Sequence, residues 1–194
     1  MKGFGAMSRQ LEGHRVAVLA ADGVEQDELV ESRRAVEAAG GTTELLSIAL
    51  GEVQAYRADI VVGDRFPVDL LVGRADVDDY DALILPGGTL GPDRLRTDDH
   101  AVAFVRHFMH VGKPVAAIGH GPWILVEAAS LVGRTLTSWP SLRTDIINAG
   151  GIHVNEKVVV DRNLVTSRGP LDLPAFCNAL VGKFTQHPEA IGQF

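Results

Sequence analysis

Three short apolar runs, each followed directly by a turn that contains glycine, constrain the fold of this chain most strongly. They span residues 16–21, 82–85 and 115–118. A run of this length between turn signals is typical of a strand buried on both faces of a parallel sheet. Helical patterns lie between these runs, and strands that alternate with helices predict an α/β sandwich around a mostly parallel sheet.

Periodicity and turn residues predict the remaining elements. Helices are expected over residues 25–39, 98–111, 122–133, 141–149 and 171–184, and further strands over residues 42–49 and 135–137. Residues 51–73 and 158–167 favour hairpins, since strand-like runs there flank turn residues. Residues 1–13 show no periodicity and are expected to be a flexible leader to a single domain over residues 14–194.

Composition narrows the class of protein. The net charge of −7 argues against a nucleic-acid or anionic-membrane partner. No apolar run reaches the roughly 18 residues that a membrane-spanning helix needs, and residues 1–15 do not resemble a secretory signal, so a cytoplasmic protein is expected. The single Cys177 excludes an intrachain disulfide and any multi-cysteine zinc site. His100, His107 and His110 lack the spacing of a zinc motif, so neither a metal nor a cofactor is expected.

Three turns end buried strands, and they predict one site. They span residues 22–28, 86–91 and 119–122. Ligands bind outside the carboxyl ends of parallel strands, so we expect the three turns to meet there. The third turn, Gly119-His120-Gly121-Pro122, has the layout of a nucleophile elbow, although Gly119 offers no nucleophile. A glycine-rich turn with only a packing role is the alternative.

Several segments in order resemble one family. They are AADGVEQDEL at residues 20–29, LPGG at 85–88, GKPVAAI at 112–118, HGP at 120–122 and VTSR at 165–168. Together they resemble the ThiJ/PfpI superfamily, which includes intracellular-protease-like proteins, bacterial general stress proteins and the Parkinson's-associated deglycase. The resemblance covers residues 15–184 and implies a flavodoxin-like three-layer sandwich in one domain.

The resemblance also implies roles for residues around the elbow. Gly119 takes the place of the family's nucleophilic cysteine, and at this position the chain departs from the family pattern. His120 matches a histidine that assists the thiol. Glu28 matches the glutamate that hydrogen-bonds the cysteine, and it is expected to be a buried, protonated acid. Glu25 is expected one helical turn earlier on the same face.

Further residues complete the implied site. Gly88 matches an oxyanion-hole donor. Asp93 falls near the acid that in some members orients the histidine from a neighbouring subunit. Trp123 is expected at the pocket rim, where it packs or touches a ligand, and Cys177 is expected in the core.

The missing thiol leaves three functions open. In the first, the chain is, or derives from, a cysteine-dependent glyoxalase-like, deglycase-like or peptidase-like stress protein, and natural or engineered loss of the cysteine leaves it inactive in that chemistry. Alternatively, it is a natural acid–base enzyme of the hydratase or isomerase type that uses Glu28, or a metabolite-binding pseudoenzyme. The sequence thus leaves open whether the chain is an enzyme. The expected partners are a small carbonyl compound or other metabolite, and further copies of the chain in a homodimer or higher homo-oligomer.

Overall fold

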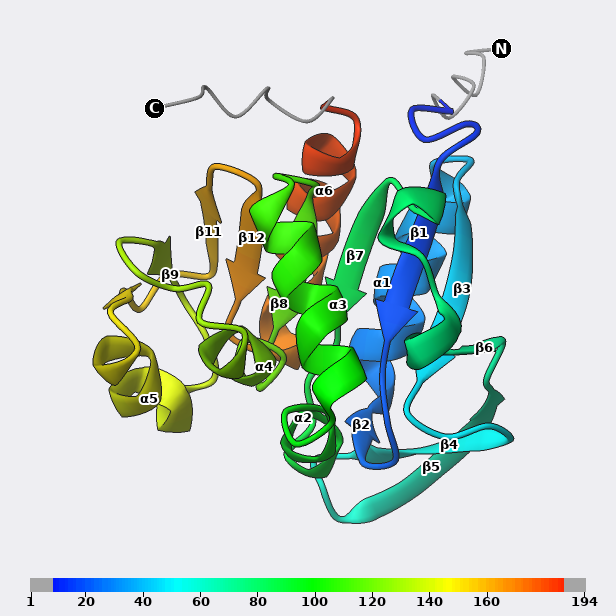
Figure 1. Cartoon of the computed structure of the whole chain (residues 1–194), viewed down its shortest axis with the longest axis horizontal. Helices are drawn as coiled ribbons and strands as arrows, with labels where there is room; N and C mark the ends of the chain where they lie inside the picture. Colours follow the sequence, from blue (N-terminus) through cyan, green and yellow to red (C-terminus); the bar gives the residue numbers. More distant parts are fainter. Residues whose placement is uncertain (1–8, 187–194) are drawn as a thin grey trace, which may run out of the picture.

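A seven-stranded sheet forms the centre of the protein (Figure 1). The computed structural model describes residues 9–186. The strands are β1 (Arg15–Leu19), β3 (Thr42–Ser47), β6 (Leu70–Leu71), β7 (Ala82–Leu85), β8 (Val115–Ile118), β11 (Val158–Asp161) and β12 (Leu164–Ser167). Their order is β11-β12-β8-β7-β1-β3-β6, and within the described residues β11 alone runs antiparallel to its neighbour. The expected mostly parallel sheet is confirmed.

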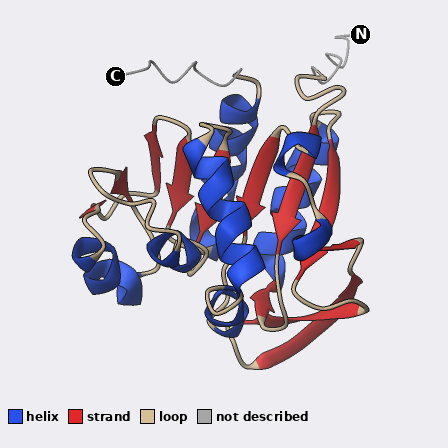
Figure 2. Ribbon diagram, viewed as in Figure 1, coloured by secondary structure: helices blue, strands red, loops and turns tan. Residues whose placement is uncertain are grey.

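Helices cover both faces of this sheet (Figure 2). The α-helices are α1 (Gln26–Ala38), α2 (Leu90–Leu95), α3 (Asp99–His110), α4 (Trp123–Glu127), α5 (Arg143–Asn148) and α6 (Leu173–Phe184). Successive side chains of a strand point to opposite faces. Accordingly, Val16 and Val18 of β1 pack with α1 and α6, whereas Ala17 and Leu19 pack with α3 and α4. The flavodoxin-like three-layer sandwich is therefore confirmed.

Two small sheets and four short 3-10 helices complete the described elements. The strands are β2 (Val24–Glu25), β4 (Glu52–Arg57) and β5 (Val61–Pro67) in one sheet, and β9 (Thr135–Leu136) and β10 (Ile152–His153) in the other. The 3-10 helices are η1 (Val72–Arg74), η2 (Val77–Asp79), η3 (Pro140–Leu142) and η4 (Pro170–Asp172). Both expected hairpins form, since β4 pairs antiparallel with β5 and β11 pairs antiparallel with β12.

Several local predictions need correction. Glu25 is not in α1, because its backbone is extended (φ −70°, ψ 118°) and pairs with β4. The helix expected over residues 122–133 ends at Glu127, because Ala129 adopts a left-handed φ of +52° and the Ser130 amide donates to the Leu125 carbonyl at 3.2 Å. Helix α2 was not expected, and β9 pairs with β10 rather than with the central sheet.

The expected leader, residues 1–13, lies mostly outside the described residues. In its last part, Leu11 is fully buried and its amide donates to the Ala39 carbonyl at 2.9 Å, so residues 9–13 pack against the domain.

No helix within residues 9–186 is both long enough and apolar enough to cross a membrane.

Candidate functional site

The three predicted turns meet at the carboxyl ends of β1, β7 and β8, at the edge of the sheet where Figure 1 shows α2 and β2. A pocket of about 350 Å³ lies there. Its lining includes most of the predicted site together with residues of the β4–β5 hairpin: Glu25, Asp27, Glu28, Arg57, Ala58, Asp59, Gly88, Gly119, His120, Trp139 and Pro170.

Glu28 is the buried acid of this pocket. It lies in the first turn of α1 with 1% of its surface exposed. Its Oε2 accepts a hydrogen bond of 2.7 Å from the Gly87 amide. Burial raises the pKa of Glu28 from 4.5 to about 8, because the bond from Gly87 only partly offsets the lost hydration and the nearby Glu25 carboxylate adds to the shift. Glu28 is therefore mostly protonated at neutral pH.

Gly119 follows β8 at the predicted elbow. Its φ of +61° lies in the left-handed region that favours glycine. A Cβ atom built on Gly119 would lie 2.7 Å from Oε1 of Glu28, so the carboxyl group occupies the space that a side chain would need. The Gly119 amide donates to the Ser167 carbonyl at 3.1 Å, and the Gly119 carbonyl accepts from the Trp139 amide at 2.9 Å. The backbone of the elbow is therefore fixed on both sides.

Two backbone amides beside Glu28 are free donors. Within the described part of the chain, the N–H groups of Gly88 and His120 have no hydrogen-bond acceptor. Gly88 has a φ of +86°, and a Cβ atom there would lie 2.3 Å from the Gly23 carbonyl oxygen, so only glycine fits. Such amides can stabilise negative charge that develops on a bound carbonyl oxygen.

His120 forms one wall of the pocket. Its Nε2 lies 3.1 Å from the Ser141 hydroxyl, and its ring is about 6 Å from those of Trp123 and Trp139. Burial lowers the pKa of His120 below 6.5, although Asp59 raises it slightly. The ring is therefore neutral at pH 7 and can accept or pass on a proton.

The β4–β5 hairpin closes the pocket from the side. Glu25 is buried, and its Oε2 accepts from the Ala58 amide at 2.8 Å. Burial raises the pKa of Glu25 as well. Asp59 accepts from the Thr89 amide at 2.8 Å and from the Thr89 hydroxyl at 2.7 Å. These bonds attach the hairpin to the turn that carries Gly88.

The sequence missed Asp59 as a site residue. Asp59 lies in a hairpin turn where Ala58 and Asp59 both have positive φ, of 51° and 62°. An aspartate in a turn is a weak local signal, and nothing in the sequence indicated where the hairpin would dock.

Two predicted site residues lie outside this pocket. Asp93 is exposed on α2, and its implied role across a subunit boundary stays a prediction. Trp123 donates from Nε1 to Asp145 at 2.8 Å and stacks under the Arg96 guanidinium at 4.5 Å. It supports the His120 ring from behind the pocket lining.

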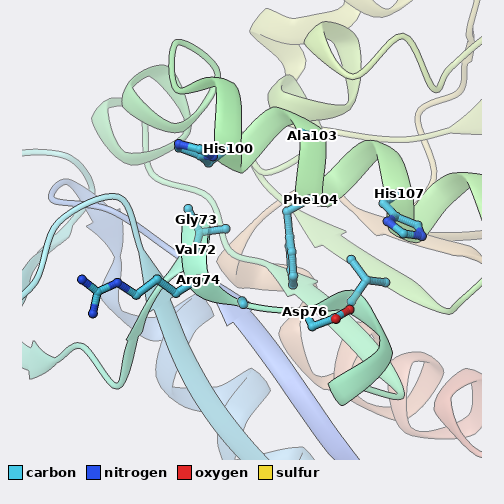
Figure 3. Close-up of a pocket in the computed structure, with 10 residues that line it drawn as sticks. Val72, Gly73, Arg74, Asp76, His100, Ala103, Phe104 and His107 are labelled. Carbon is cyan, nitrogen blue, oxygen red and sulfur yellow. The ribbon is translucent and has the colours of Figure 1, made fainter.

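A second hollow lies between η1, η2 and α3 (Figure 3). His100 and His107 both line it, together with Arg74 and Asp76. Figure 3 shows the two imidazole rings at separate ends of the hollow. Among residues 9–186, no group of three or more potential ligands could hold a metal ion.

The fold and this site define a flavodoxin-like α/β protein with a left-handed glycine elbow after one central strand and a buried acid beside it. The chain belongs to the DJ-1/PfpI family, whose profile matches residues 14–183.

Known proteins support this assignment. The chain is 38% identical over 167 residues to the deglycase TK1284 of Thermococcus kodakarensis (86% of this chain, 97% of that protein). Its fold is similar to Drosophila melanogaster DJ-1beta, with a TM-score of 0.79, 25% identity and coverage of 89% of this chain and 90% of that one. It is also similar to a two-domain protein from Anabaena variabilis with DJ-1/ThiJ/PfpI-like and ferritin-like domains. The TM-score is 0.82 and the identity 30%, and the match covers 93% of this chain and 52% of that one.

Proposed function

We propose that this chain catalyses proton transfer on a small carbonyl compound with Glu28 as the acid–base group and without a covalent intermediate. The observation that carries the proposal is the buried Glu28 carboxyl, whose Oε1 faces Gly119 in a pocket that also holds two free amides. At Gly119 the family resemblance implies a cysteine, and glycine supplies no nucleophile. Deglycase, glyoxalase or peptidase turnover through a thiol should therefore be at background.

The proposed reaction is isomerisation or hydration. In isomerisation, ionised Glu28 removes a proton from the carbon next to the carbonyl, the amides of Gly88 and His120 stabilise the enolate oxygen, and the proton returns to a neighbouring atom. In hydration, Glu28 takes a proton from water as the new C–O bond forms, and then returns it to the oxyanion. Neither route needs an oxidant or reductant.

The charge of the pocket restricts its substrates. Besides the mostly protonated Glu28, three carboxyl groups line it (Glu25, Asp27 and Asp59), whereas Arg57 is its only arginine or lysine and pairs with Asp27 at 3.3 Å. Like charges repel, so a substrate that carries a carboxylate or phosphate should bind poorly. We expect an uncharged or cationic carbonyl compound.

Proton exchange followed by NMR tests the proposal. The protein is incubated with methylglyoxal or dihydroxyacetone in D₂O, and deuterium at the carbon next to the carbonyl reports isomerisation. Because the pKa of Glu28 is about 8, kcat/KM for a reaction with Glu28 as base should rise with pH and level off above 8.

Glu28→Gln should abolish this activity, and Glu31→Gln on the exposed side of α1 is the matched control. An unchanged rate in Glu28→Gln would exclude acid–base catalysis. Saturable binding of the carbonyl compounds without turnover in the parent protein would instead favour a metabolite-binding pseudoenzyme.

Gly119→Cys tests the missing-thiol interpretation. The new thiol would lie at the elbow next to a protonated Glu28 and the free His120 amide, both of which favour thiolate. Its pKa, followed by thiolate absorbance, should fall below the ordinary value of about 8.5. An ordinary or raised pKa would contradict this interpretation.

We also propose self-association through the β4–β5 hairpin. Ile60, Val61 and Val62 at its tip are 82%, 55% and 66% exposed, which is unusual for three consecutive apolar residues. Light scattering after size-exclusion chromatography should show an oligomer that Ile60→Asp dissociates. A monomeric parent protein would refute this.

A further inference from the structure

A third open hollow, of about 370 Å³, lies at the opposite edge of the sheet from Glu28. It is formed by the last turn of α3, the α4–β9 connection and the β11–β12 turn, and Figure 1 shows the last turn of α3 and the β11–β12 turn at the edge away from α2 and β2. The lining residues are Arg106, Met109, His110, Ala128, Ala129, Ser130, Val132, Arg134 and Arg162. Three are arginines and none carries a carboxylate.

The positive charge of this hollow is only partly balanced. Asp161 is the carboxylate beside it, with Oδ1 3.0 Å from Nε of Arg162 and 3.8 Å from Nη1 of Arg134. Arg106 forms no ion pair within residues 9–186, and the nearby Glu127 carboxylate pairs with Arg96 instead. Two of the three guanidinium groups therefore share one carboxylate and the third has none within the described residues, in a chain whose net charge is −7.

Each guanidinium is held in place but keeps free donors. Arg106 donates to the carbonyls of Ala128 and Glu127 at 3.2 and 3.4 Å. Arg162 donates to Asp161 and to the Gly133 carbonyl. A guanidinium has five N–H donors, and these contacts use two in each residue. The others have no acceptor within the described residues.

Arg134 contributes the third guanidinium group of the hollow, and its side chain is buried. It is 6% exposed, and it donates to the Asp161 carbonyl at 3.2 Å and to the Asn163 side chain. The carboxylate within ion-pairing distance of this buried cation is that of Asp161, at 3.8 Å, so a bound anion would add to the pairing of its charge. Two non-glycine residues of the lining, Ala129 and Arg162, also have left-handed φ values of +52° each, and such strain concentrates at ligand sites.

We propose that this hollow binds a small polyanion that carries phosphate groups or several carboxylates. Planar guanidinium groups bind both kinds of oxyanion through paired N–H donors. The volume suits a metabolite-sized ligand. The site is independent of the Glu28 pocket, which is acidic and should repel the same ligand.

Isothermal titration calorimetry at low ionic strength tests the proposal, with pyrophosphate as the phosphate probe and citrate as the carboxylate probe. At least one should bind saturably with one site per chain, and added salt should weaken it. Arg106→Gln should weaken binding about tenfold or more, since a charge-assisted contact of this kind contributes at least about 1.4 kcal/mol. Arg106→Lys should keep part of the affinity.

Arg34→Gln is the matched control, because Arg34 is an exposed arginine on α1 that pairs with Glu31. It should leave binding unchanged. NMR titration should shift the amide signals of Ser130 and Arg162 and leave that of Gly88 in place. No binding of either probe, equal affinities in Arg106→Gln and Arg34→Gln, or shifts confined to the Glu28 pocket would each overturn the proposal.

Discussion

Replacing Glu28 by glutamine should stabilise the protein, and the gain should depend on pH in a defined way. The pKa of Glu28 is about 8 in the folded protein, against 4.5 for an ordinary glutamate. Below pH 4.5 the carboxyl is protonated in both the folded and the unfolded chain, so ionisation costs no stability. As pH rises from 4.5 to 8, the unfolded chain releases the proton while the folded protein retains it, and the folded state becomes less stable.

The size of the effect follows from the two pKa values. Each pKa unit corresponds to about 1.4 kcal/mol. At pH 7 the penalty on the folded state is therefore about 3 kcal/mol, and above pH 8 it levels off on the order of 5 kcal/mol. Glutamine cannot ionise, and its side-chain carbonyl can still accept the hydrogen bond from Gly87. Glu28→Gln should thus gain these amounts in free energy of unfolding and change little at pH 4.

Urea denaturation of both proteins from pH 4 to pH 9 measures this difference. Glu31→Gln, on the same helix, is the control, because Glu31 is partly exposed and its ion pair with Arg34 is worth at most about 1 kcal/mol. Glu25 is present in all three proteins, so the part of its pKa shift that comes from its own burial cancels in the comparison. A difference between Glu28→Gln and the parent that does not change between pH 5 and pH 8 would refute the buried-acid assignment.

Two further predictions, each with a control substitution, concern packing at the elbow and at a buried hydroxyl. Gly119→Ala should destabilise the protein by about 1–3 kcal/mol, because the new Cβ would lie 2.7 Å from Glu28 Oε1 and the φ of this residue is left-handed. Gly133→Ala is the control, because Gly133 has a φ of +67° and no neighbour within 4 Å, so that it carries only the backbone cost. Equal losses of stability in chemical denaturation would show that the Glu28 side chain moves away from the new Cβ at no cost. Thr137→Val should raise stability by about 1 kcal/mol, since the buried Thr137 hydroxyl has no hydrogen-bond partner among the described residues. Thr166→Val should lower stability, because the Thr166 hydroxyl accepts a hydrogen bond of 3.0 Å from the Thr137 amide. A lower melting temperature for Thr137→Val would contradict the first assignment.

The sequence by itself determined the layered fold and the location of the site. Short apolar runs between turn signals, such as residues 82–85 and 115–118, are typical of buried strands, and the glycines at 88 and 119 mark turns that other residues would strain. These signals are local, because periodicity and turn chemistry depend on neighbours along the chain. Over residues 122–133, where a helix was predicted, the structure ends the helix at Glu127, before a left-handed Ala129.

The family resemblance had named several residues of the site, and only the tertiary structure decided their surroundings. The Glu28 carboxyl fills the space over Gly119 because α1 packs beside the end of β8, and its pKa is raised because the surrounding fold excludes water. Asp59 reaches the pocket because the β4–β5 hairpin docks on the turn after β7. Desolvation and charge depend on which distant segments cover a group, and no local pattern in a sequence carries that information.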